Sequence, residues 1–259
     1  MIPRHLALQR SSNTEVGGIM RGGILLTLLT TVLVAAQTAG AQTAKPEHKP
    51  PTILLVGASG MIGSRILEEA TSRGHLVLAA SRHPEKIASG PNIEPVKLDA
   101  TDPKAFAAEA KHADVIVLAT SPRGSGDPVA QAKAVANTAI ATARATHKRL
   151  VVVGGAGSLN LTDGRRVVDT LPQNYQAEAL AMRSVLDTLK TTSDIDWTFF
   201  SPPMSIAPGT HTGKYRLGTT VLLTDDKGQS RISAEDYADA LVSELEKREH
   251  VRSQMTAAY

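Results

Sequence analysis

A short run of residues has the composition and spacing of a phosphate-binding turn. Gly57-Ala-Ser-Gly-Met-Ile-Gly63 follows an aliphatic run and precedes an amphipathic segment. Gly57 can form a tight turn, Gly60 has no β-carbon to hold a diphosphate away, and Gly63 allows close helix packing. The amides at 59–62 would face an anion at the positive end of the helix dipole. The pattern therefore predicts dinucleotide binding by Gly57, Ser59, Gly60, Met61, Ile62 and Gly63; the alternative is a glycine-rich turn without a ligand.

A basic residue follows the second aliphatic run. Many NAD-specific folds have an acidic residue at the end of this strand, where it accepts hydrogen bonds from the ribose. This chain has Ser81-Arg82 there. Because a guanidinium pairs well with a phosphate, Arg82 predicts that NADP is preferred over NAD. The alternative is a surface arginine at a strand end, in which case NAD remains possible.

The segments around these positions alternate between strand and helix patterns. Aliphatic runs typical of strands buried on both faces occur at 52–57, 76–80, 93–98, 114–119, 150–153 and 197–201, with 254–259 as a candidate for a last strand. Helical patterns cover 61–73, 127–145, 174–190 and 234–248. Asp102, Asp127 and Ser233 are placed as N-caps, the last in a capping-box pattern with Asp236 in place of Glu. The alternation predicts one α/β domain with a doubly wound, Rossmann-like parallel sheet.

The glycine spacing is G-x-x-G-x-x-G, and with it the chain resembles the extended and atypical short-chain dehydrogenase/reductases. It is most similar to the NAD(P)H-binding subgroup that includes the NmrA-like and NADH-flavin reductase-like proteins. The resemblance covers 52–259 and is carried by the glycine turn together with the segments at 80–82, 98–99, 118–120, 153–155, 196–198 and 232–237. The glycine turn is specific, whereas the other segments are weak when taken singly.

The resemblance implies roles for residues that follow the next strands. It implies that Asp99 accepts from the adenine amino group; the alternative is a turn or capping residue. It also places Ala119, Thr120, Ser121 and Pro122, which follow the fourth strand, along the nicotinamide ribose. Gly154 and Gly155 follow the fifth strand, and ligands of open α/β sheets lie outside the carboxyl ends of the strands. We therefore expect these loops to converge on one crevice.

The catalytic residues are less well defined by the sequence. Short-chain reductases usually carry Tyr-x-x-x-Lys after the fifth strand, where the lysine holds the ribose and makes the tyrosine a better acid. Tyr175 stands at the tyrosine position, but Ala179 replaces the lysine. Tyr175 is thus the candidate catalytic residue, with a role in lining the pocket as the alternative.

The absence of the lysine bears on the type of reaction. A carbonyl acceptor needs a proton donor beside the developing alkoxide, whereas a flavin or quinone can take its proton from solvent. The sequence predicts an NAD(P)H-dependent oxidoreductase that reduces a flavin, quinone or small carbonyl compound. The segments 201–204 and 209–218 would then shape the acceptor pocket. A non-catalytic NADP-binding redox sensor and a sugar-nucleotide epimerase-like isomerase remain alternatives.

The first 41 residues resemble a secretory signal peptide. Arg21 precedes an apolar run at 24–36, and Ala39 and Ala41 match an A-x-A cleavage pattern. The run is short for a bilayer span, which favours a cleaved signal peptide. An uncleaved membrane anchor is the alternative. Residues 42–51 read as a proline-containing linker. The pattern predicts export to the periplasm, although a reductase needs a nicotinamide pool, which favours the cytoplasmic or anchored alternatives.

Composition excludes several classes of protein. The chain has no cysteine, which rules out disulfides, a thiol nucleophile and thiolate-bound metals. The eight histidines form no i,i+4 pair and no cluster with carboxylates at metal-ligand spacing, so no metal site is predicted. Without residues 1–41, 25 basic and 24 acidic residues remain. This near-neutral balance favours a small-molecule substrate and argues against a nucleic-acid partner.

Overall fold

The computed structural model describes residues 50–122 and 126–259. The strands are β1 Ile53–Val56, β2 Val77–Ser81, β3 Ile93–Lys97, β4 Val115–Leu118, β5 Arg149–Val153, β6 Trp197–Ser201, β7 Ser205–Ala207, β8 Arg216–Gly218, β9 Arg231–Ser233 and β10 Ser253–Ala258. The α-helices are α1 Met61–Ser72, α2 Pro103–Ala110, α3 Pro128–Thr146, α4 Gln173–Lys190 and α5 Ala234–Lys247. Short 3₁₀ turns are η1 Pro84–Lys86, η2 Ala156–Ser158 and η3 Val167–Thr170.

The main sheet has eight strands in the order β3-β2-β1-β4-β5-β6-β10-β8. All neighbouring pairs are parallel except β10 and β8, which are antiparallel. The strand order reverses direction between β1 and β4, where Leu55 pairs with Ala79 on one side and Val117 on the other. This is the doubly wound topology predicted from the sequence, and the two flanking crossovers leave a crevice at the switch point.

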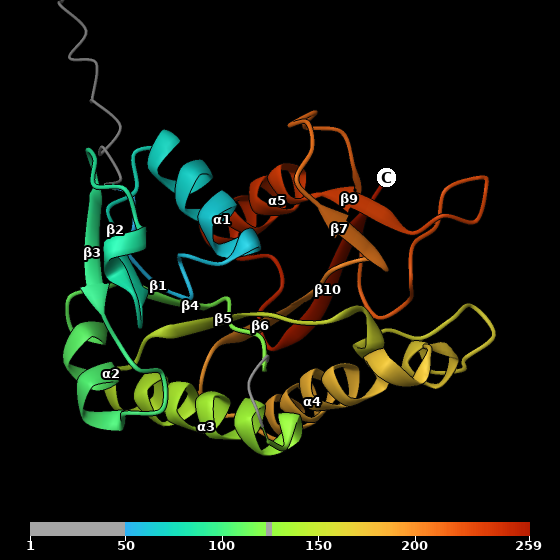
Figure 1. Ribbon diagram of the computed structural model, residues 1–259, viewed down its shortest axis with the longest axis horizontal. Helices are drawn as coiled ribbons and strands as arrows, with labels where there is room; N and C mark the ends of the chain where they lie inside the picture. The colour runs from blue at the N-terminus through green and yellow to red at the C-terminus, as the bar shows by residue number, and fades with distance from the viewer. Residues whose placement is uncertain (1–49, 123–125) are drawn as a thin grey trace, which may run out of the picture. The chain divides into compact units, whose positions relative to one another are not determined.

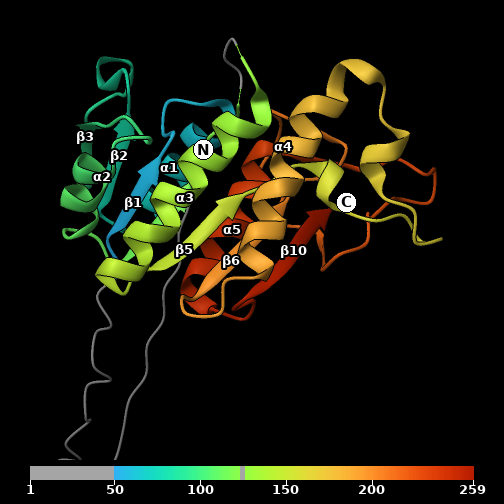
Figure 2. The same cartoon turned by 90° about the horizontal axis from the view of Figure 1, so that it is seen from below.

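Helices cover both faces of the sheet, which explains why its central strands are aliphatic throughout. Leu54 and Val56 point into a core with helices α2, α3 and α4, whereas Ile53 and Leu55 point into a core with α1 and α5. Figure 1 shows α1 and α5 above the sheet and the other three helices below it. Seen from below, α3 and α4 lie side by side across the strands (Figure 2).

The predicted strands and helix starts agree with the structure, with one difference. The carboxylates of Asp102 and Asp127 accept main-chain amides at the starts of α2 and α3, and Ser233 accepts the amide of Asp236. The reciprocal bond expected of a capping box is replaced in α5, because the Ser233 amide donates to the hydroxyl of Tyr259 instead. The Asp236 carboxylate instead accepts hydrogen bonds from the main-chain amides of Thr212 and Gly213 and from the hydroxyl of Thr212.

Residues 1–41, predicted to be a signal segment, and positions 42–49 of the predicted linker lie outside the described residues. Within 50–122 and 126–259, no helix is both long enough and apolar enough to span a bilayer.

Candidate functional site

The glycine turn lies at the carboxyl end of β1, where close packing excludes side chains. Gly57 has φ of +92°, and a β-carbon there would stand 2.4 Å from the carbonyl oxygen of Ala119. A β-carbon on Gly63 would stand 2.1 Å from the carbonyl oxygen of Gly57. Helix α1 has Gly60 as its N-cap, with no side-chain hydrogen bond to the first turn. The first-turn amides of α1 are therefore presented to an anion without a competing side chain.

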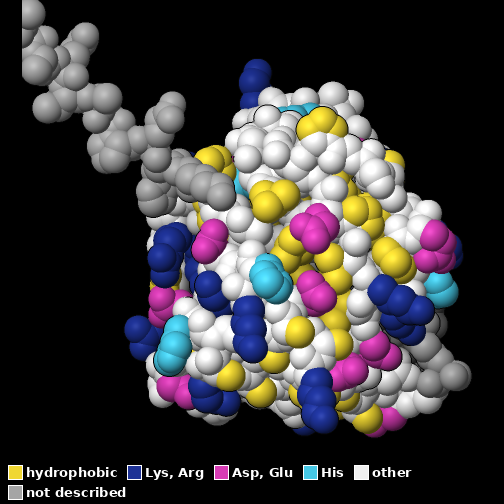
Figure 3. Space-filling model, turned by 90° about the vertical axis from the view of Figure 1, so that its left-hand side faces the viewer, with side chains coloured by type: hydrophobic (Ala, Val, Ile, Leu, Met, Phe, Trp, Pro, Cys, Tyr) yellow, Lys and Arg dark blue, Asp and Glu magenta, His cyan; other side chains and the backbone are white. Residues whose placement is uncertain are grey.

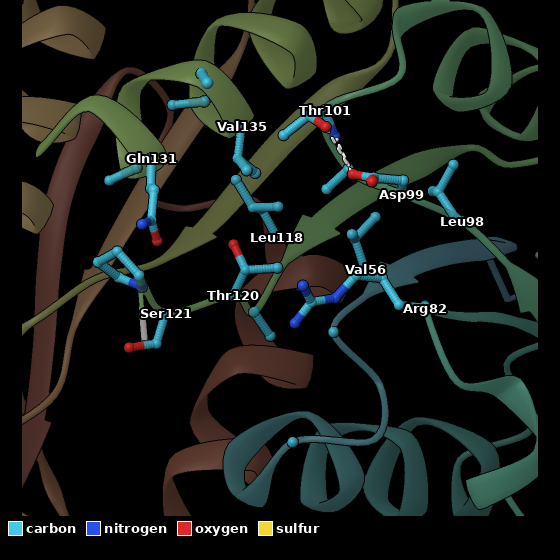
Figure 4. A pocket seen from close by; sticks show the side chains of 18 of the residues that line it. Val56, Arg82, Leu98, Asp99, Thr101, Leu118, Thr120, Ser121, Gln131 and Val135 are labelled. Carbon is cyan, nitrogen blue, oxygen red and sulfur yellow. Dashed lines mark hydrogen bonds between the residues drawn. The ribbon is translucent and has the colours of Figure 1, made fainter. Parts of the chain in front are cut away.

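A cavity of about 790 Å³ opens beside this turn. Its volume lies within the range of small-molecule and cofactor sites. Its predicted members are Gly57, Ser59, Gly60, Arg82, Asp99, Ala119, Thr120, Ser121 and Pro122. Apolar side chains from the strand ends and from α3 and α4 complete the wall, including Leu118, Val135 and Met182. Figure 4 shows the guanidinium of Arg82 directed toward the middle of this group.

A serine pair ties the glycine turn to the end of β2. The hydroxyls of Ser59 and Ser81 are 2.8 Å apart, and Ser81 also accepts the main-chain amide of His83 at 3.1 Å. Ser81 is buried, whereas Arg82 is exposed on the cavity wall. No carboxylate follows directly on β2, where the chain reads Ser81, Arg82 and His83. The basic side chain thus faces the cavity where an acidic residue would repel a ribose phosphate.

Asp99, which follows β3 beside β2, is a hydrogen-bond acceptor on the same side of the cavity as Arg82. Its Oδ1 accepts the amide of Thr101 at 2.9 Å and the hydroxyl of Thr101 at 2.7 Å, as drawn in Figure 4. These two hydrogen bonds lower the pKa of the Asp99 carboxyl, and the positive charge of Arg82 lowers that pKa further. Asp99 therefore stabilises the turn that follows β3 and also lines the cavity.

The remaining predicted residues do not line the cavity. They are Met61, Ile62 and Gly63 in the first turn of α1, Gly154 and Gly155 after β5, and Tyr175 in the first turn of α4. A β-carbon on Gly154 would stand 2.2 Å from the ring of Phe199, so packing against the sheet already explains this glycine. The side chain of Tyr175 is 58% exposed. The structure thus gathers the predicted cofactor residues more completely than the predicted catalytic one.

Several cavity residues lie outside the predicted set, and three of them come from the end of β2 and the start of α3. Ser81 ends β2, and Gln131 and Val135 lie in the first turns of α3. The Asp127-Pro128 cap signal was the available clue to Gln131 and Val135, because a helix that follows a parallel strand starts at the carboxyl edge of the sheet. The segments 201–204 and 209–218 contribute no residue to the cavity wall, so their proposed acceptor role stays a prediction.

Ser158, which follows β5, is part of a buried polar network. Its hydroxyl donates to the carbonyl of Gly155 at 2.6 Å and lies 2.8 Å from the hydroxyl of Ser201. The amide of Gln254 bonds to Ser201 at 2.9 Å and to Ser158. With only 3% of its surface exposed, Ser158 joins β5, β6 and β10 and is not presented to a substrate.

The fold also assembles an ion cluster that the sequence did not suggest. Ligand-type atoms of Glu69, His211 and Asp239 lie within 4.8 Å of one another. Arg73 bonds to both carboxylates, and the hydroxyl of Tyr215 donates to Asp239 at 2.7 Å. The guanidinium therefore already supplies the positive charge of this cluster, and the absence of a metal remains a prediction.

Surface charge is mixed on the face in Figure 3, where basic and acidic side chains are interspersed. The described residues on that face form no continuous basic surface of the kind that binds a nucleic-acid backbone.

Comparisons with known proteins support NAD(P)H binding by this chain. A family model described as NAD(P)H-binding matches residues 57–248. Among solved structures, a "putative exported protein" from Burkholderia pseudomallei is 44% identical with a TM-score of 0.73, covering 81% of this chain and 100% of that one. A "putative epimerase" from Bacteroides thetaiotaomicron is 36% identical with a TM-score of 0.76, covering 82% and 98%. A "putative NADH-flavin reductase" from Streptococcus pneumoniae TIGR4 is 30% identical with a TM-score of 0.72, covering 80% and 99%.

The matched region runs from the glycine turn through α5 and includes nearly the whole cavity wall. The family ligand is therefore a nicotinamide dinucleotide. The glycine turn and the adjoining cavity suit a ligand of this kind. The chain belongs to the NAD(P)H-binding family, in the atypical subgroup of the short-chain dehydrogenase/reductases.

Proposed function

We propose that this protein is an NAD(P)H-dependent oxidoreductase that prefers NADPH. The observation that carries the proposal is the cavity of about 790 Å³, with the glycine turn at one wall and Arg82 at another. The turn presents uncapped helix amides for a diphosphate. Arg82 supplies a fork of donors that matches a phosphate on the adenosine ribose.

In this proposal the cofactor lies across the carboxyl edge of the sheet. Its diphosphate rests on the turn at 57–63, and its adenosine half extends toward Arg82 and Asp99. Its nicotinamide half extends toward Ala119, Thr120, Gly154 and Gly155. The packing of Gly154 against Phe199 is compatible with a second use of its main chain beside the ring.

The acceptor is proposed from what the site lacks. Ala179 stands where the ammonium of a Tyr-Lys pair would be, and Tyr175 lies outside the cavity wall. The bound cofactor supplies a hydride, two electrons with one proton, and the acceptor takes its second proton from water. A flavin or quinone meets this condition, and a small carbonyl compound meets it less readily. Similarity to the Streptococcus pneumoniae protein supports a flavin acceptor.

The test is an assay of the purified full chain. NADPH and NADH are each titrated, and oxidation is then followed with free flavins, quinones and small carbonyl compounds. We expect tighter binding of NADPH and turnover with flavin or quinone. Binding without turnover across the panel would favour a redox sensor. The position of Tyr175 outside the cavity wall is compatible with a sensor, because a sensor needs no catalytic acid. A sugar nucleotide that raises Tm would favour the isomerase, as the Bacteroides thetaiotaomicron relative suggests.

We further propose that the protein is exported and cleaved after Ala41. The signal-like segment at 1–41 and the similarity to the Burkholderia pseudomallei protein support this location. Mass spectrometry of the protein from its native host should find a chain that starts at Gln42. An intact N-terminus would leave the anchored or cytoplasmic alternative.

A further inference from the structure

A hydrogen bond joins two segments beside the cavity that are far apart in the sequence. The hydroxyl of Ser121 donates to Oε1 of Glu178 at 2.5 Å, across a separation of 57 residues. Ser121 follows β4 and lines the cavity, whereas Glu178 lies in the second turn of α4 and is half-buried. The contact therefore links the loop after β4 to the start of the helix after β5.

Glu178 does not itself line the cavity, but it lies one helical turn before residues of α4 that do. Glu178 precedes Met182 by four residues, and Met182 and Val185 both line the cavity. Residues at i and i+4 lie on the same face of a helix, one turn apart. Glu178 thus extends the cavity-facing side of α4 by one turn toward the carboxyl edge of the sheet.

The position along the sheet identifies which part of the cofactor lies nearby. Arg82 and Asp99 follow β2 and β3, on one side of the diphosphate turn. Ser121 follows β4, on the other side of that turn, and neighbouring strands are about 4.8 Å apart. In the cofactor orientation of the proposed function, on which this step rests, the nicotinamide ribose lies beside β4.

We propose that Glu178 and Ser121 form a ribose clamp, in which the Glu178 carboxylate accepts a hydrogen bond from a hydroxyl of the nicotinamide ribose. A vicinal diol offers two donors, and a carboxylate can accept about four hydrogen bonds. Ser121 orients the carboxylate through its own hydrogen bond. Hydrogen bonds to an ionised acceptor are roughly twice as strong as neutral ones.

The clamp would replace a missing contact with one of opposite polarity. In the Tyr-x-x-x-Lys pattern a lysine donates to this ribose, but Ala179 has no donor. Glu178, the adjacent residue on α4, supplies an acceptor in its place. Glu178 is a positioning residue here, because it holds the nicotinamide half and transfers no proton.

The experiment compares the whole cofactor with its adenosine half. Dissociation constants of NADPH and of 2′,5′-ADP are measured by calorimetry for the full chain and for Glu178→Ala, Glu178→Gln and Ser121→Ala. Glu178→Ala should weaken NADPH about tenfold or more and leave 2′,5′-ADP within about twofold. Glu178→Gln keeps the shape but loses the charge, so its effect on NADPH should be intermediate. The control is Asp187→Asn, an exposed acid further along α4.

The outcomes separate the clamp from the proposed function. NADPH affinity that is unchanged in Glu178→Ala, or that falls in proportion to 2′,5′-ADP affinity, would overturn the clamp alone. A wild-type chain that binds neither ligand would overturn the proposed function together with the clamp. Thermal unfolding of each variant identifies any loss of affinity that merely follows a loss of fold.

Discussion

Gly57 lies directly against the main-chain carbonyl of Ala119, so that a β-carbon on Gly57 would stand 2.4 Å from that oxygen. The loops after β1 and β4 therefore touch at the switch point of the sheet. Their contact forms one wall of the cavity and leaves no room there for any residue but glycine. In the proposed function, cofactor binding and folding therefore depend on the same absence of a side chain at Gly57.

Gly57→Ala should cost about 3 kcal/mol or more of unfolding free energy and abolish NADPH binding, because it combines an unfavourable φ with a backbone clash. Gly74→Ala is the matched control. Gly74 has φ of +85°, but its new methyl group would have nothing within 4 Å, so this variant isolates the conformational cost of about 1–2 kcal/mol. Urea unfolding and NADPH titration measure both. Equal losses of stability in the two variants would contradict the clash.

Arg82→Ala should weaken NADPH binding about 10- to 100-fold, since a charge-assisted pair with the ribose phosphate is lost. NADH, which lacks that phosphate, should bind within about twofold of wild type. Lys86→Ala removes an exposed cation close in sequence that is not on the cavity wall, and it controls for general attraction of anions. Calorimetric titration gives both constants. Equal weakening of NADPH and NADH in Arg82→Ala would remove Arg82 from the phosphate site.

Gly154→Ala should cost about 2–4 kcal/mol, because its methyl group would stand 2.2 Å from the ring of Phe199. Phe199→Leu alone should cost about 1–2 kcal/mol through lost packing. The double variant should be more stable than the sum of the two losses implies, by about 1–3 kcal/mol. Chemical denaturation of the four chains closes this cycle. Strict additivity would show that the glycine is needed for a reason other than the phenyl ring.

Asp236 should contribute stability that disappears in acid. Burial on its own would raise the pKa of this carboxyl, but donors from Thr212, Gly213 and Tyr259 outweigh burial and lower it. A carboxyl whose pKa is lowered on folding stabilises the protein above its ordinary pKa, and this stabilisation is lost as the pH falls through the folded-state value.

Asp236→Asn should therefore lose about 2–4 kcal/mol at pH 7 and lose less further stability than wild type below about pH 4. Urea unfolding across this pH range measures the difference. Asp187→Asn, at an exposed position, should retain the wild-type profile. Parallel profiles for wild type and Asp236→Asn would show that the carboxylate charge is not what holds the 212–213 loop.

The elements of the sheet were predictable because their determinants are local. Continuous aliphatic runs such as 53–56 and 115–118 can be satisfied only by burial on both faces, and proline after a capping aspartate marks a helix start. The glycine turn was predictable for the same reason, since its three glycines, its strand and its helix are contiguous. Strands β7, β8 and β9 were missed because each has three residues of mixed polarity.

The candidate site required the tertiary structure wherever its contacts cross long sequence distances. Ser59 meets Ser81, Ser121 meets Glu178, and Asp236 meets Thr212 and Tyr259 only after the sheet has formed. The sequence alone determined that the chain has a glycine turn of the dinucleotide-binding type. It also determined that Ala179 replaces the lysine that would accompany Tyr175. The fold decided which side chains face the cavity and that Tyr175 does not, because exposure depends on packing between elements and not on residue type.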